Sequence, residues 1–185
     1  MNGTRIIGID PGVSGAVALL EDGGFVAVED LPTIVRSKSA KSTKRMINGA
    51  ELARIIREWS PNVAIIELVN AMPPKGSRRC PACNMSPYGS AAAFNFGESS
   101  GVIRGVVAAL GIEAHYVTPQ SWKRRATLSG SDKEASRMLA VTLWPEAPLG
   151  RKKDQGRAEA LLIARFGVAA FDADPMKADP FRLAG

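Results

Sequence analysis

The sequence contains a single histidine and two cysteines in 185 residues. A structural zinc site takes four Cys or His ligands, and the pair Cys80 and Cys83 has no second pair in the chain to complete one. The histidine, His115, lies inside an expected strand, where a packing role is commoner than a catalytic one. The histidine is therefore expected to have a structural role.

The sequence also lacks a run of about 18 apolar residues, and "MNGTRIIG" has no basic segment followed by an apolar core. We therefore expect neither a membrane span nor a secretion signal, and place the protein in the cytoplasm. A length of 185 residues, with 45% apolar and 23% charged residues, fits one globular domain. This domain is expected at 1–171, followed by a flexible tail at 172–185.

Acidic residues are the scarcer charge, with 18 Asp and Glu against 24 Lys and Arg and a net charge of +6. More than half of the basic residues lie in four acid-free windows, at 36–45, 75–79, 123–125 and 151–153. A positive charge can serve solubility alone. Clusters of Lys and Arg are instead typical of proteins that bind phosphate backbones, and they predict a nucleic-acid partner.

The hydrophobic pattern predicts an α/β fold. Strands are expected at 5–10, 15–20, 25–30, 62–68 and 113–118, and helices at 48–59, 96–110, 132–144 and 156–171, with a short helical segment from Pro119. The basic, Ser-rich residues 36–46 are expected to form a mobile loop, and 70–90 a long loop. Tight turns between the first three strands predict an antiparallel meander, and the later alternation of strands and helices predicts a parallel extension.

Two of the expected strands end on an acid, namely Asp10 in "RIIGID" and Glu67 in "VAIIE". A carboxylate at the end of a strand that is buried on both faces is costly unless it is paired. Either acid alone is compatible with the start of a solvent-exposed loop. Two acids at neighbouring strand ends repel unless a cation lies between them, and Mg²⁺ and Mn²⁺ prefer such oxygen ligands. The sequence therefore predicts a metal site.

A third acidic segment leads into the last expected helix. Asp154 lies just before this helix, and Glu159 lies within it among Ala and Leu residues, which should turn Glu159 inward. The two acids are five positions apart, so they face one site only if Asp154 lies at or before the first turn. Asp154 is equally well placed there to cap the helix, and both interpretations stay open.

Six segments, in this order over roughly residues 5–165, resemble one known family: "IGIDPGVSGAVAL", "AIIELV", "FNFGESSGVIRGVVAALG", "VTPQSWKR", "DKEASRMLA" and "KKDQGRAEALLIA". The chain resembles the RuvC-like Holliday junction resolvases of the ribonuclease H-like superfamily, and most of all their short phage and prophage members. The resemblance implies a ribonuclease H-like fold, with a five-stranded mixed sheet flanked by helices. It also implies a homodimer of single RuvC-like nuclease domains in a bacterial cell or a phage-infected host.

The resemblance further implies a crossover junction endodeoxyribonuclease that cleaves branched DNA with two Mg²⁺ or Mn²⁺ ions per site. Asp10 and Glu67 match the family's strand acids, and Glu159 matches the second of two metal-binding residues on the last helix. One turn earlier stands Gly156, which cannot be a ligand, so Asp154 is nominated for that role. The products are expected to carry 5′-phosphate and 3′-hydroxyl ends.

The remaining site residues are also implied by the resemblance. Lys123 of "WKR" matches a catalytic lysine near the scissile phosphate, although it is equally one member of a basic patch. Gln155 stands where relatives with this motif often have His. Glu98 of "FGES" is expected to have a structural role. DNA contacts are expected from Lys75, Arg78, Arg79, Lys123, Arg124, Lys152 and Lys153.

The segment "CPAC" holds the two cysteines, Cys80 and Cys83. Three states are compatible with it: free thiols in a loop, one four-cysteine zinc shared by two protomers, or a local disulfide under oxidation. A zinc or redox role for the pair therefore stays open.

Three other functions fit parts of the sequence. "GIDPGVSG" also resembles the phosphate loop of actin-like ATPases and sugar kinases, but these enzymes need two such domains and 185 residues are too few. A ribonuclease H-like nuclease that acts on flaps, forks or RNA–DNA hybrids is compatible with the same motifs. A catalytically inactive module that binds branched DNA is disfavoured by the four acids.

Overall fold

The computed structural model describes residues 3–38, 43–68, 90–130 and 133–172. Within these ranges the largest sheet has five strands, in the order β3 (Gly24–Asp30), β2 (Ala16–Glu21), β1 (Arg5–Asp10), β6 (Val63–Glu67) and β7 (Glu113–Val117). The first three pair antiparallel, whereas β1, β6 and β7 pair parallel. The predicted meander with a parallel extension is confirmed.

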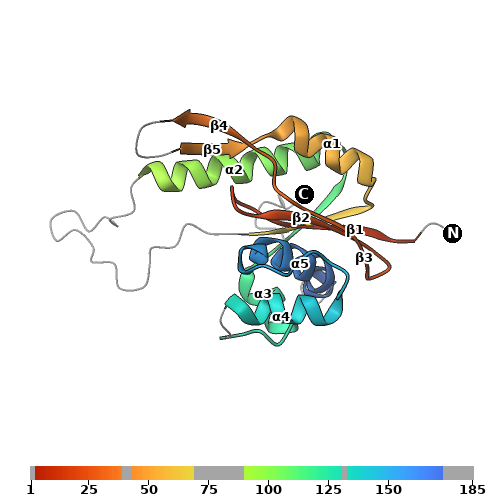
Figure 1. The fold of residues 1–185 in the computed structure, drawn as a ribbon. Coiled ribbons are helices and arrows are strands. Elements are labelled where there is room, and N and C mark those ends of the chain that lie inside the picture. The colour runs from red at the N-terminus through yellow and green to blue at the C-terminus, as the bar shows by residue number, and fades with distance from the viewer. Residues whose placement is uncertain (1–2, 39–42, 69–89, 131–132, 173–185) are drawn as a thin grey trace.

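Helices cover both faces of this sheet (Figure 1). One face carries α1 (Gly49–Trp59) and α2 (Ser90–Ala109). The other carries α3 (Pro119–Arg125), α4 (Lys133–Leu143) and α5 (Gln155–Asp172), the last preceded by the short 3₁₀ turn η1 (Lys152–Asp154). The helix expected at 96–110 thus begins earlier, at Ser90. No helix in the described part of the chain is long and apolar enough to cross a membrane.

Alternate residues of each central strand serve the two faces. Ile7 and Ile9 of β1 are buried in the apolar core under α1 and α2, and so is Ile66 of β6. Ile65 is buried in the second core, under α3, α4 and α5. Because side chains alternate across a strand, Glu67 shares the α5 face with Ile65. Asp10, three positions after Ile7, likewise lies on the face opposite to Ile7 and Ile9.

The prediction of a mobile loop is wrong for 36–38 and 43–46, whereas 39–42 lie outside the described residues. The described residues belong to a two-stranded antiparallel ribbon, formed by β4 (Thr33–Lys38) and β5 (Thr43–Ile47), which lies beyond α2 on its side of the sheet (Figure 1). Most of its side chains are exposed on both faces of the ribbon, so the sequence shows no alternation of apolar and polar residues from which strands are predicted.

Helix α5 packs closely against β1 because Gly8 has no side chain. A Cβ atom at this position would overlap the backbone of Ala160 and Ala164 in α5. Buried alanines at 158, 160 and 164 complete the smooth surface of the helix. This contact sets the distance between the helix and the strand that ends on Asp10.

We predict that Gly8→Ala lowers the free energy of unfolding by about 1–3 kcal/mol or more, because α5 must move away from β1 to admit the methyl group. Gly101→Ala is the matched control, since Gly101 is exposed on α2 with open space around it. This control should raise stability by about 0.5–1 kcal/mol. Urea unfolding measures both changes, and equal effects would contradict the close contact.

Candidate active site

The site begins with two strand ends that the sheet places side by side. In the parallel pairing of β1 with β6, Ile9 lies opposite Ile66, so the next residues along the two strands are Asp10 and Glu67. Asp10 is half-buried and Glu67 is buried. The predicted proximity of the two acids therefore follows directly from the strand register.

Helix α5 adds a third carboxylate from the same face of the sheet. Glu159 lies near Asp10 and Glu67, close enough to raise the pKa of each. Gly156, one turn before Glu159, leaves room for Asp10, because a Cβ atom at 156 would lie 3.3 Å from Asp10 Oδ2. The glycine thus keeps the space in front of Asp10 open.

The basic partner of these acids comes from α3. Thr118 caps this helix through a 3.2 Å hydrogen bond accepted from Ser121 N, and Pro119 occupies its first turn. The helix presents Lys123, whose Nζ lies 3.2 Å from Glu159 Oε1. The structure therefore brings together four of the predicted site residues, namely Asp10, Glu67, Glu159 and Lys123.

Trp122 fixes the position of Glu67. Its indole is fully buried, and Nε1 donates a 2.7 Å hydrogen bond to Glu67 Oε1. The Lys123 ammonium lies 5.0 Å from the centre of the same ring, a cation–π contact. Sequence reasoning placed Trp122 on a short helix but gave it no role, since its partner is 55 positions away.

Burial and the neighbouring carboxylates destabilise the ionised forms of Asp10 and Glu67. Burial, together with the negative charges of Glu67 and Glu159, raises the pKa of Asp10 to about 8, although Lys123 acts in the opposite direction. Burial also raises the pKa of Glu67, with a contribution from Glu159 and against the hydrogen bond from Trp122. Full ionisation of the cluster is therefore disfavoured without a cation, and a bound cation would stabilise the ionised carboxylates.

These residues suit a divalent cation in chemistry and charge, since carboxylate oxygens are the ligands that Mg²⁺ and Mn²⁺ prefer. However, within the described residues no group of three or more Asp, Glu, His or Cys side chains is arranged so that it could hold a metal ion as it stands. Glu67 is turned toward Trp122, and Glu159 accepts from Lys123 and from Gln155 Nε2, both at 3.2 Å. Metal binding would thus require at least one side chain to exchange its present partner.

Asp154 is held apart from this cluster by arginine. Its buried carboxylate accepts hydrogen bonds from Arg151 Nη2 at 2.7 Å and from the backbone N–H of Arg151 at 2.8 Å. These bonds lower the pKa of Asp154. Of the two interpretations left open by the sequence, the contacts match a cap on the turn before α5, with Asp154 as its third residue.

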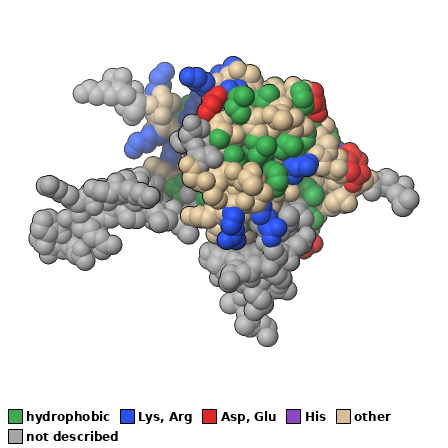
Figure 2. Space-filling view, turned by 90° about the horizontal axis from the view of Figure 1, so that it is seen from below, with side chains coloured by type: hydrophobic (Ala, Val, Ile, Leu, Met, Phe, Trp, Pro, Cys, Tyr) green, Lys and Arg blue, Asp and Glu red, His purple; other side chains and the backbone are tan. Residues whose placement is uncertain are grey.

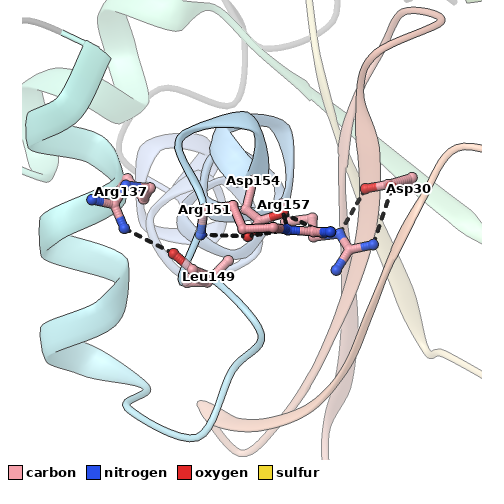
Figure 3. A network of polar contacts seen from close by, with 6 residues as sticks. All are labelled: Asp30, Arg137, Leu149, Arg151, Asp154 and Arg157. Carbon is pink, nitrogen blue, oxygen red and sulfur yellow. Dashed lines mark hydrogen bonds and ion pairs between the residues drawn. The ribbon is translucent and has the colours of Figure 1, made fainter.

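Arginines connect this turn to its neighbours (Figure 3). Arg157 of α5 forms a two-bond ion pair with Asp30 at the end of β3, at 2.6 and 3.0 Å. Arg137 of α4 donates to the carbonyl oxygen of Leu149 at 2.9 Å. The beginning of α5, which leads to Glu159, is therefore tied to both the sheet and α4.

A pocket of about 460 Å³ opens beside the carboxylates. Asp10 and Glu159 line it together with Gln155, while Lys152, Lys153 and Glu134 also contribute to its wall. Gln155, rather than Asp154, is the residue at the start of α5 that faces this space. Its signal in the sequence was its place four positions before Glu159, where relatives often have His.

The other predicted residues fall into three groups. Arg124, Lys152 and Lys153 are exposed. Glu98 forms an ion pair with Arg36, with Oε2 2.6 Å from Arg36 Nη1, and this contact is consistent with a structural role. Five residues, Lys75, Arg78, Arg79, Cys80 and Cys83, lie outside the described residues.

The sequence is similar to that of a Holliday junction resolvase from an alga. No model of a known protein family matches the chain. In an alignment of 158 residues that covers 78% of the chain, it is 31% identical to the chloroplastic Holliday junction resolvase MOC1 of Chlamydomonas reinhardtii. The match spans only 18% of that relative's length.

Two solved structures share the fold. Thermus thermophilus RuvC in complex with a Holliday junction substrate matches with a TM-score of 0.54 and 14% identity, over 92% of this chain and 96% of that one. A second structure of Thermus thermophilus RuvC matches over the same shares with a TM-score of 0.53 and 16% identity. The comparisons confirm the resemblance to RuvC-like resolvases and the RuvC form of the ribonuclease H-like fold. The greater likeness to phage members stays a prediction.

We predict that Asp10→Asn stabilises the metal-free protein at pH 8. Between the ordinary pKa near 3.8 and the raised pKa of about 8, the folded protein binds more protons than the unfolded chain, so stability falls as pH rises. The amide removes this loss, and we expect a gain of about 1–2 kcal/mol at pH 8 and less at pH 5. Urea unfolding in EDTA measures it, with Glu146→Gln, an exposed acid outside the site, as control. An Asp10→Asn variant that is less stable than wild type at both pH values would contradict the cost of ionising Asp10 in the folded protein.

We predict that Asp154→Asn lowers stability by about 1 kcal/mol at pH 7, because the cap on the turn before α5 is weakened. The lowered pKa means that this contribution is present above the ordinary pKa of 3.8 and is lost as pH falls below it. Manganese titration, followed calorimetrically, should show an affinity within about twofold of wild type. A large loss of manganese affinity would instead restore Asp154 as a ligand.

Proposed function

We propose that the protein is a metal-dependent endonuclease that cleaves four-way or other branched DNA junctions. One observation carries the proposal: Asp10, Glu67 and Glu159 converge beside Lys123 at the carboxyl ends of parallel strands in a RuvC fold. The algal relative's description as a Holliday junction resolvase supports this class of substrate. The basic surface supports a nucleic-acid partner.

Asp10, Glu67 and Glu159 would hold Mg²⁺ or Mn²⁺, two ions per site, with Gln155 as a neutral oxygen donor within reach. Bound divalent cations supply an activated water and stabilise the leaving oxygen in phosphodiester hydrolysis. The carboxylates set the charge of the site and Trp122 orients Glu67. Hydrolysis of this type leaves 5′-phosphate and 3′-hydroxyl ends.

Lys123 has two roles in this proposal. Without DNA it neutralises Glu159, and with DNA its ammonium is available to the scissile phosphate. Lys152 and Lys153 flank the pocket, where they would bind the phosphate backbone on either side of the cleaved bond. A homodimer of such chains would place two sites on one four-way junction, in the cytoplasm of a bacterial cell or of a phage-infected host.

A nuclease acting on flaps, forks or RNA–DNA hybrids would use the same carboxylates, so the substrate must be tested directly. Synthetic four-way junctions, flaps, forks and hybrids, each beside a linear duplex of the same sequence, separate these classes. Faster cleavage of the junction supports the proposal. Preference for a hybrid or a flap would overturn the substrate assignment, and equal cleavage of linear duplex would remove branch specificity.

We predict that Asp10→Asn and Glu67→Gln each lower junction cleavage by at least about 100-fold, since each removes a negative charge from the proposed metal site. Junction binding should persist, because neither carboxylate is expected to hold DNA without metal. Glu58→Gln is the matched control, since its exposed side chain on α1 pairs with Arg54. Single-turnover cleavage and gel-shift assays measure the two effects. Wild-type cleavage by either site variant would refute the assignment.

A further inference from the structure

The β4–β5 ribbon has little packing of its own. In the described structure its two strands form a separate two-stranded sheet. Five of the six residues of β4 are exposed, and so are the first three of β5. A two-stranded ribbon is marginally stable by itself in water. Such an arm therefore needs a fixed base, and it offers most of its surface to a partner.

A β-bulge supplies the fixed base. Val35 pairs with Arg45 and Ser37 with Lys44, so Arg36 is the extra residue on β4. Bulges re-aim the inserted side chain. Arg36 Nη1 lies 2.6 Å from Glu98 Oε2 and 3.4 Å from Asn95 Oδ1, both on α2. Arg36 thus connects the ribbon to the helix, and its charge is already paired.

Basic residues beyond the bulge carry the ribbon's charge. Lys38, Lys44 and Arg45 are exposed, and neither strand contains an acid. Arg45 Nη1 also donates to Thr33 Oγ1 at 2.8 Å, which holds its guanidinium over the neighbouring strand. Figure 2 shows Lys and Arg side chains along this arm where it leaves the body of the molecule, at the left of the view.

The arm points toward the active-site end of the molecule. In Figure 1, β4 runs toward the same end at which β6 finishes on Glu67, whereas α1 lies nearer the opposite end. A strand of six residues is about 20 Å long, and the DNA major groove is about 12 Å wide and admits a two-stranded ribbon. The arm thus has the charge and the direction to contact a duplex that enters the site, and the DNA major groove admits a two-stranded ribbon of this kind.

We propose that the β4–β5 ribbon is a DNA-binding arm that holds the phosphate backbone of one duplex of the branched substrate. Lys38, Lys44 and Arg45 make the contacts, and Arg36 is a positioning residue that fixes the arm on α2. The inference rests on the proposed function, since it names the part of the chain that receives the substrate outside the carboxylate site.

Paired substitutions test the contacts. Lys38→Ala with Lys44→Ala should weaken binding of a synthetic four-way junction and lower the slope of log affinity against log salt by up to about 1.8, at about 0.9 per phosphate contact. Arg54→Ala with Arg57→Ala on α1 is the matched control, because it removes the same charge from exposed residues away from that end. The control should change the slope by less than about 0.5. Equal changes of the salt slope in the two double variants would overturn the assignment of the ribbon to DNA binding, since the loss of positive charge in general would explain both.

Glu98→Gln tests the positioning role. This variant makes the protein more positive, so general electrostatics predicts tighter binding. Release of Arg36 from α2 predicts weaker binding instead, and we expect a loss of about threefold or more with the melting temperature shifted by less than about 3 °C. Arg36→Gln should give a similar loss. Tighter binding by Glu98→Gln would overturn the assignment of Arg36.

Further outcomes separate the arm from the proposed function. Failure of the wild type to bind any junction would overturn both. If the wild type binds a junction and the double variant Lys38→Ala with Lys44→Ala keeps the same salt slope, only the assignment of the ribbon to DNA binding is overturned. Exposed strand edges also pair with other chains, and basic residues oppose such pairing. Light scattering of the same variants therefore completes the test, since a change of oligomeric state with normal DNA binding would make the ribbon an interface between copies and overturn its assignment to DNA.

Discussion

The parallel pairing of β1 with β6 is the constraint on which the site depends. It places Asp10 beside Glu67, and the alternation of side chains directs both to the face that α5 covers. Burial of Asp10, followed by repulsion from Glu67 and Glu159, makes its ionised form costly in the folded protein, as its pKa of about 8 shows. Burial of Ile7, Ile9, Ile65 and Ile66 offsets this repulsion, because the strands cannot separate without exposing apolar surface on both sides of the sheet.

Helix α5 completes the site because it lies so near the sheet. The absence of a side chain at Gly8 allows the approach, and the same absence at Gly156 keeps space before Asp10. At the beginning of the helix, Arg151, Asp154 and Arg157 form contacts to the turn and to β3. The acids thus differ in their partners: Asp154 is paired with Arg151 in the turn before α5, whereas Asp10 has a raised pKa beside Glu67 and Glu159, so its ionised form would be stabilised by a cation.

Basic residues are distributed around this acidic centre. Lys123 lies next to the carboxylates, Lys152 and Lys153 lie at the pocket, and the ribbon extends from the other side of the sheet. A DNA phosphate backbone would therefore be attracted by the basic surface, and under the proposed function it would approach the acids at one place, the pocket beside Asp10 and Glu159. Metal-dependent nucleases require this combination, since carboxylates without metal repel the phosphate that they are to cleave.

The sequence by itself predicted the five-stranded sheet and the helices that flank it, because long apolar periods are local signals, and its ordered motifs nominated Asp10, Glu67, Glu159 and Lys123, which the structure brings together. It did not determine the partner of Asp154, since five positions of spacing allow either a ligand or a cap, and the direction of Arg151 decides between them. It did not reveal Trp122 as the partner of Glu67 either, because the two are joined only after α3 packs beneath the sheet. The ribbon at 33–47 escaped prediction because its strands are held by cross-strand hydrogen bonds and by the contact of Arg36 with α2, not by a buried face. Tertiary structure alone decides such features, since their stability comes from partners that are distant in the chain.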